Sequence, residues 1–344
     1  MFRNWLRSIR QAIRSLEPKP FDTYAVYAPR VAAALSRRGY NLCLEGDLEG
    51  ALQAFNEALV YAPKSAVVFN NRACAFLEQC EYDRAIQDCN TALGIDPALA
   101  SAFCNRGSAH LGKLDLQQGA EDYDRCLSLD PNYSVAYSNR SFVSLVAADF
   151  ERAVQDCDHA ITLDPSYSLA HRNRGAIAFC QGRFDEAEKH LGVAAELDPK
   201  APEIGLWLHL AQLRTAEPEA SELNPPSAIL DLTKWPGPLV SLLSGSAEEQ
   251  TVLSATKDPN PDKERGQLCG AYFVIGEKAL INDDRERARL YFRKSLETGA
   301  INYLECSAAK AELDRLDGVT RDPKAPNSEE EPGLKEKIAN PDLP

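Results

Sequence analysis

The 344-residue sequence has the composition of a soluble globular protein, with 44% hydrophobic and 26% charged residues. Its formal net charge of −13 argues against general nucleic-acid binding, because such proteins present a basic surface to phosphates. No apolar run approaches the ~20 residues of a membrane span. The ten cysteines include no C-x-x-C pair, and this many unpaired thiols fits a reducing compartment better than an oxidising one.

The first sixteen residues have a basic amphipathic pattern. Apolar side chains recur there at helical spacing, at Phe2, Trp5, Leu6, Ile9, Ile13 and Leu16. Four arginines occupy the other side, and no acidic residue occurs before Glu17. We predict an amphipathic helix over residues 1–16 and a proline-containing linker over residues 17–31. Three roles stay open for the helix: contact with an anionic membrane surface, a cap on the domain that follows, or an Arg-rich transit peptide.

A 34-residue period dominates the next segment. Prolines recur at this interval, at Pro63, Pro97, Pro131, Pro165 and Pro199. If each proline is position 32 of a repeat, five repeats span residues 32–199. Each repeat has small residues at positions 8 and 20 and large or apolar residues at positions 4 and 24. Small residues let two antiparallel helices approach closely, and the proline ends the second helix, because it lacks an N–H and disfavours helix in the preceding residue.

This pattern resembles the tetratricopeptide repeat, a unit of two helices in 34 residues. The resemblance implies an all-α fold in which the helix pairs stack into a right-handed superhelical solenoid, because one pair cannot bury its apolar face alone. Arginine occupies position 7 in all five copies, and an aspartate occupies position 23 in the middle three. We interpret these residues as structural ion pairs within each repeat rather than as an anion-binding ladder.

The resemblance also implies a concave groove, lined by positions 2, 5, 9, 12 and 13 of each first helix. These positions are mostly small or apolar here, which favours an extended or helical protein ligand with apolar anchors. The chaperone carboxylate clamp of some relatives is not expected, because Ser36 and Tyr40 stand where its basic and amide residues would lie. The expected binding residues are Tyr40, Leu77, Leu111, Phe142, Leu145 and Phe179.

The remainder is predicted to form a C-terminal helical module over residues 200–317, with a degenerate sixth repeat over residues 267–300. Four of its residues match positions 4, 8, 20 and 24, namely Tyr272, Gly276, Ala288 and Phe292. Residues 318–344 are rich in Pro, Glu and Lys and poor in apolar residues, so we predict a disordered tail.

The region after the repeats is similar to the bacterial NlpI lipoprotein type. The similarity rests on two segments, Leu206–Ala211 and Trp235–Gly245, and on the helix pair that follows them. That resemblance implies a homodimeric, non-catalytic adaptor that holds peptidoglycan hydrolases and a protease together in the cell envelope. Such proteins begin with a lipoprotein signal ending in cysteine, whereas the first cysteine here is Cys43. We therefore expect the cytoplasm or a membrane surface, and the cell envelope if the true start codon lies elsewhere.

No set of residues suited to catalysis is evident. The five histidines lack metal-binding spacing, and the sequence contains no G-x-S-x-G, Walker or G-x-G-x-x-G motif. The sequence therefore predicts a non-catalytic adaptor that needs no cofactor or metal and binds other proteins rather than nucleic acid. The alternative is a peripheral membrane scaffold anchored by residues 1–16.

Overall fold

The computed structural model describes residues 20–215, 231–301 and 303–319. All regular structure in these ranges is helical, which confirms the all-α prediction. The chain divides into two compact units, unit 1 (residues 1–143) and unit 2 (residues 144–344), and each is described by itself. The predicted N-terminal amphipathic helix and the tail from residue 320 lie outside the described residues.

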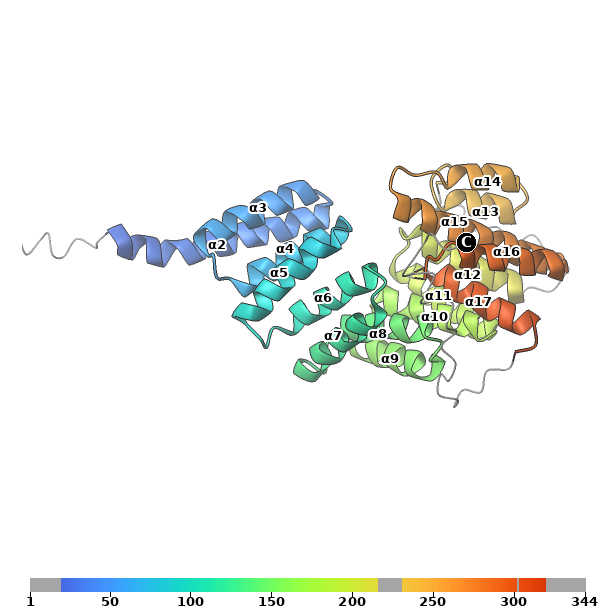
Figure 1. Cartoon of the computed structure of the whole chain (residues 1–344), viewed down its shortest axis with the longest axis horizontal. Coiled ribbons are helices and arrows are strands. Elements are labelled where there is room, and N and C mark those ends of the chain that lie inside the picture. Colours follow the sequence, from blue (N-terminus) through green and yellow to red (C-terminus); the bar gives the residue numbers. More distant parts are fainter. Residues whose placement is uncertain (1–19, 216–230, 302, 320–344) are drawn as a thin grey trace, which may run out of the picture. The chain divides into compact units, whose positions relative to one another are not determined.

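Unit 1 consists of helix pairs, labelled in Figure 1. They are α2 (Pro20–Glu45) with α3 (Leu48–Tyr61), α4 (Ala66–Glu78) with α5 (Tyr82–Ile95), and α6 (Ala100–Gly112) with α7 (Leu116–Leu129), followed by residues 134–143 of α8 (Ser134–Val146). Aspartates begin two of the second helices: Asp47 and Asp115 each accept a hydrogen bond from a backbone N–H in the first turn. The bounds follow the predicted 34-residue period.

The expected linker over residues 17–31 is helical from residue 20 onward. Helix α2 starts at Pro20, a position where the missing N–H of proline removes no helical hydrogen bond. The helix also contains Pro29 in its interior. The first helix of the repeats therefore begins twelve residues before residue 32, because neither proline interrupts it.

A glycine at position 8 lets the two helices of a pair approach. A methyl group added at Gly39 would lie 2.7 Å from the Phe55 ring, and one at Gly107 would lie 2.9 Å from the Tyr123 ring. The large residue at position 24 thus packs over position 8 of its own pair. Real side chains do not approach this closely, so the pairs depend on the missing methyl groups.

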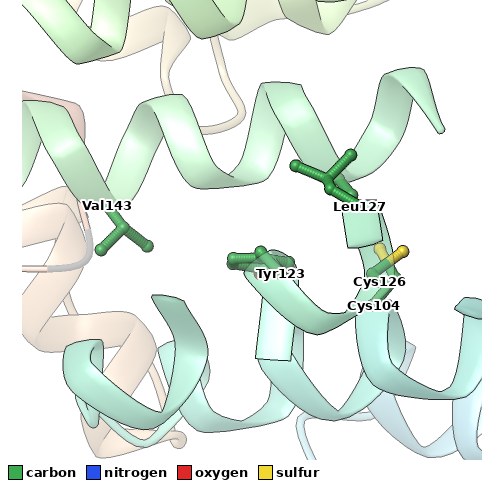
Figure 2. Close-up of a cluster of buried hydrophobic side chains, with 6 residues drawn as sticks. Cys104, Tyr123, Cys126, Leu127 and Val143 are labelled. Carbon is green, nitrogen blue, oxygen red and sulfur yellow. The ribbon is translucent and has the colours of Figure 1, made fainter. Parts of the chain in front are cut away.

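The core of the third pair shows how cysteine is used. Figure 2 shows the buried side chains of Cys104 and Cys126 next to each other and near Leu127, and the cluster continues through Tyr123 to Val143. These thiols pack as small apolar groups, and burial likewise raises the pKa of Cys89 in the preceding pair to about 12.

The position-7 arginines are structural in the two repeats of unit 1 that show the full contact. Arg72 donates two hydrogen bonds to Asp88 (2.6 and 2.7 Å) and a third to Asn56 of the preceding repeat (2.6 Å). Arg106 makes the corresponding three bonds one repeat later. Each arginine therefore joins both helices of its own pair to the second helix of the previous pair, as the ion-pair interpretation requires.

Unit 2 continues the helix pairs and adds a C-terminal set of helices. It contains α9 (Phe150–Leu163), α10 (Ser168–Cys180), α11 (Phe184–Leu197), α12 (Pro202–Thr215), α13 (Gly237–Leu243), α14 (Glu249–Ala255), α15 (Pro261–Ile281), α16 (Arg285–Glu297) and α17 (Leu304–Leu316). Helices α15 and α16 pair closely, and a methyl group on Gly276 would lie 2.5 Å from the Phe292 ring. Among the described residues, none of the helices has the length and hydropathy needed to cross a bilayer.

Candidate functional site

Hydrogen bonds donated by asparagine side chains hold the first helices of unit 1 side by side. Asn71 on α4 donates to the Ser36 hydroxyl on α2 (3.2 Å), and Asn105 on α6 donates to the side-chain oxygen of Asn70 on α4 (3.0 Å). Because Ser36 and Asn70 are buried at position 5, this seam leaves positions 2, 9 and 13 to project away from it.

Among the projecting positions of the first two repeats, those with side chains larger than alanine form what we call the open face: Tyr40, Leu44, Val67, Cys74 and Glu78. The Tyr40, Leu44 and Val67 side chains are 54%, 72% and 55% exposed, which is high for residues of this size. Cys74 is also exposed. An apolar surface of this kind on a repeat scaffold is typical of a protein-binding site.

Glu78 is the acidic member of the open face. Partial burial and, second, the Glu78 carboxylate raise the pKa of Cys43, so this carboxylate lies near a thiol of the first repeat. Within the described part of the chain, no side chain or backbone group pairs with the Glu78 carboxylate. An exposed acid beside apolar side chains is suited to a ligand that combines apolar groups with a cation.

The six expected binding residues do not all reach the surface. Tyr40 is exposed, and Leu77 and Leu111 are half-buried against the cores of the second and third pairs. The other three are buried, namely Phe142 in unit 1 and Leu145 and Phe179 in unit 2. Three exposed residues, Leu44, Val67 and Glu78, also occupy the lining positions of the repeat. They were not among the six expected binding residues.

Phe179 is buried because the C-terminal module packs on it. Its ring makes edge contacts with Phe184, Trp207 and Phe273, at centroid distances of 5.1, 5.4 and 6.3 Å. Trp207 stacks on Phe273 at 5.5 Å. Position 12 of this repeat is therefore part of the core of unit 2 and is not available to a ligand.

Helix α17 covers the same face of α10 that is open in the first two repeats. Arg315 in the last turn of α17 donates to the carbonyl oxygens of Phe179 (3.5 Å) and Cys180 (3.1 Å), at the end of α10. In the first turn of α17, Glu305 lies near Arg172. Burial lowers the pKa of Arg172, and the Glu203 and Glu305 carboxylates offset only part of this effect. Helix α17 thus runs parallel to α10 along its lining positions.

A buried ionic cluster fixes this arrangement. Arg214 on α12 donates to Glu277 on α15 (2.8 Å) and to Glu312 on α17 (3.1 Å), and Glu312 also pairs with Arg315. Glu277 is completely buried, and burial together with the Glu312 charge raises its pKa to about 8. The cluster joins three helices of unit 2 across the face that α17 occupies.

Stacked helix pairs with a shared seam of first helices define an all-α helical-hairpin solenoid. Two family models described as tetratricopeptide repeat match residues 100–133 and 168–201. The chain therefore contains tetratricopeptide repeats, as its 34-residue period predicts.

Several solved structures are similar to parts of this chain. The thermophilic tetratricopeptide repeat protein TTC0263 of Thermus thermophilus is 20% identical, with a TM-score of 0.49, over 53% of this chain and 99% of that one. A tetratricopeptide repeat protein from Parabacteroides merdae is 16% identical, with a TM-score of 0.45, over 81% and 99%. Pseudomonas aeruginosa pilF is 15% identical, with a TM-score of 0.45, over 83% and 99%. No curated protein matches the chain. None of these similarities tests the NlpI resemblance, which stays a prediction.

Proposed function

We propose that this protein is a non-catalytic adaptor that binds a partner protein on the open face of its first two repeats. The observation that carries the proposal is the contrast between equivalent positions. Leu44 at position 13 of the first repeat is 72% exposed, whereas Cys180 at the same position of the fifth repeat lies beneath α17. Within unit 2 the chain thus covers the lining with its own helix, whereas within unit 1 the equivalent position is exposed.

The NlpI resemblance supports a finer version of this proposal. In that version the partners are peptidoglycan hydrolases and a protease of the bacterial cell envelope, and the adaptor is a homodimer. The alternative is a peripheral membrane scaffold anchored by residues 1–16, which rests on their basic amphipathic pattern.

The test uses the double variant Leu44→Glu/Val67→Glu, which places two charges on the open face. The matched control is Val60→Glu, at a side chain that is 70% exposed on α3, a second helix. Tagged full-length chains are used to capture partners from cytosol and from membranes, and circular dichroism confirms equal helicity. We expect the double variant to lose partners that the control and the parent chain retain. Retention of every partner by a folded double variant would exclude the open face as the site.

A further inference from the structure

We propose that the open face is also occupied by the Met1–Leu16 segment of a second copy of this chain, so that the protein self-associates and its own N-terminus competes with the partner. The proposal uses the same face as the proposed function but concerns a different occupant. Its basis is a comparison, position by position, between the covered and the open ends of the lining.

Unit 2 shows what this lining accepts. The occupant of α10 is a helix, α17, that lies parallel to it and buries Leu304, Ala308 and Leu313. It is fixed at one end by Arg315, which donates to the carbonyl groups that end α10. A cation is favoured there because the last carbonyls of a helix carry partial negative charge and lack helical partners.

Unit 1 presents the matching features without an occupant among the described residues. Glu78 is the last residue of α4 and occupies position 13, as Cys180 does in α10. Its carboxylate, which has no partner among the described residues, adds a negative charge at the carbonyl end of that helix, where a cation is favoured. The apolar side chains that a docked helix would cover are Tyr40, Leu44 and Val67.

The Met1–Leu16 segment has the complementary chemistry. It combines six apolar residues at helical spacing with arginines at 3, 7, 10 and 14, and it contains no acid. In a helix parallel to α4, Arg14 is in the last turn, as Arg315 is in α17. Binding through the apolar stripe, with Arg14 against Glu78, is the helix-in-groove mode of recognition.

The length of the connection assigns the segment to a second copy. Three residues separate Leu16 from Pro20, where α2 begins, and Tyr40 lies twenty residues further along α2. At 1.5 Å per residue that is about 30 Å, whereas a sixteen-residue helix is about 24 Å long. Folded back on its own α2, the apolar centre of such a helix would lie well short of Tyr40 and Leu44. A second copy has no such constraint.

The experiment is a charge exchange in the full-length chain, read as weight-average mass by sedimentation. Glu78→Arg and Arg14→Glu are each expected to weaken self-association about tenfold, because each opposes like charges. An equimolar mixture of the two variants is expected to associate again, because the natural segment of one chain then meets the natural face of the other. The control Val60→Glu is expected to associate like the parent chain.

A parent chain that is monomeric at every concentration would overturn the proposal, as would single variants that associate normally. A parent chain that stays monomeric but floats with phosphatidylserine vesicles would assign Met1–Leu16 to a membrane surface instead. The partner-capture experiment tests the adaptor proposal separately. If the parent chain is monomeric and Leu44→Glu/Val67→Glu still loses its partners, the adaptor proposal is supported and the self-association proposal is not.

Discussion

Glu277 gives the protein a pH dependence that can be measured. Its carboxyl is fully buried on α15, and burial, followed by the Glu312 charge, raises its pKa from the ordinary 4.5 to about 8. Between these two values the folded chain holds a proton that the unfolded chain has released. The free energy of unfolding therefore falls as pH rises, by up to about 1.4 kcal/mol per pH unit. This contribution to stability is complete below pH 4.5 and is lost as pH rises through about 8.

The variant Glu277→Gln keeps the size of the side chain and removes the titration. We expect the stability of the variant relative to the parent chain to increase by roughly 3–4 kcal/mol between pH 5 and pH 8. Urea unfolding followed by tryptophan fluorescence measures this difference, because Trp207 stacks on Phe273 in the same core. Glu297→Gln, at an exposed position on α16, is the matched control for replacing a carboxylate by an amide.

Other titrating groups cancel in that comparison. Burial lowers the pKa of both His190 and His209, which makes stability rise with pH near 6.5 in the parent chain and in the variant alike. A difference between parent and Glu277→Gln that stays constant from pH 5 to pH 8 would refute the reasoning. It would show that Arg214 holds the Glu277 carboxyl in its ionised form throughout this range.

Three further predictions concern packing, and thermal or urea unfolding measures each. Phe179→Ala should lower the free energy of unfolding by about 3–5 kcal/mol, whereas Tyr40→Ala should change it by less than about 0.5 kcal/mol, although both positions were predicted to line one groove. Gly107→Ala should lower the free energy of unfolding by about 1–3 kcal/mol, because the added methyl group would meet the Tyr123 ring. Gly94→Ala should raise the free energy of unfolding by about 0.5–1 kcal/mol, because no atom lies within 4 Å of the added methyl group and alanine favours the helix. Arg106→Ala should cost about 1.5–3 kcal/mol, because it removes two hydrogen bonds from the buried Asp122 carboxylate on α7. Equal changes in the free energy of unfolding for Phe179→Ala and Tyr40→Ala, or for Gly107→Ala and Gly94→Ala, would contradict the packing described above.

The features that the sequence predicts well are those that repeat. The 34-residue period locates the helix pairs because each proline must lie where a helix ends. The pairing of Arg72 with Asp88 follows from a spacing of 16 residues that recurs one repeat later. The contact of Gly107 with Tyr123 has the same spacing, and so does that of Gly276 with Phe292. Local repetition of this kind needs no knowledge of distant segments.

The features that the sequence does not predict depend on segments far apart in the chain. Phe179 has the same repeat position as Leu77, but the packing of α12 and α15 on its ring places Phe179 in a core, whereas Leu77 is half-buried. Arg315 meets the end of α10 across 135 residues, a contact that no periodicity encodes. Sequence patterns therefore indicate the positions that could bind but not which of them remain free.

The distribution of free positions follows from how a solenoid has to end. A terminal helix pair leaves an apolar face without a neighbour, and a repeat protein needs a cap to cover it. This chain covers the far end by folding α15 and α17 onto the lining, so position 13 there belongs to the core, as Cys180 shows. The same position in the first two repeats, Leu44 and Glu78, is exposed. The helices that cover the lining in unit 2 therefore also remove it as a binding surface there, whereas the equivalent positions in unit 1 stay exposed.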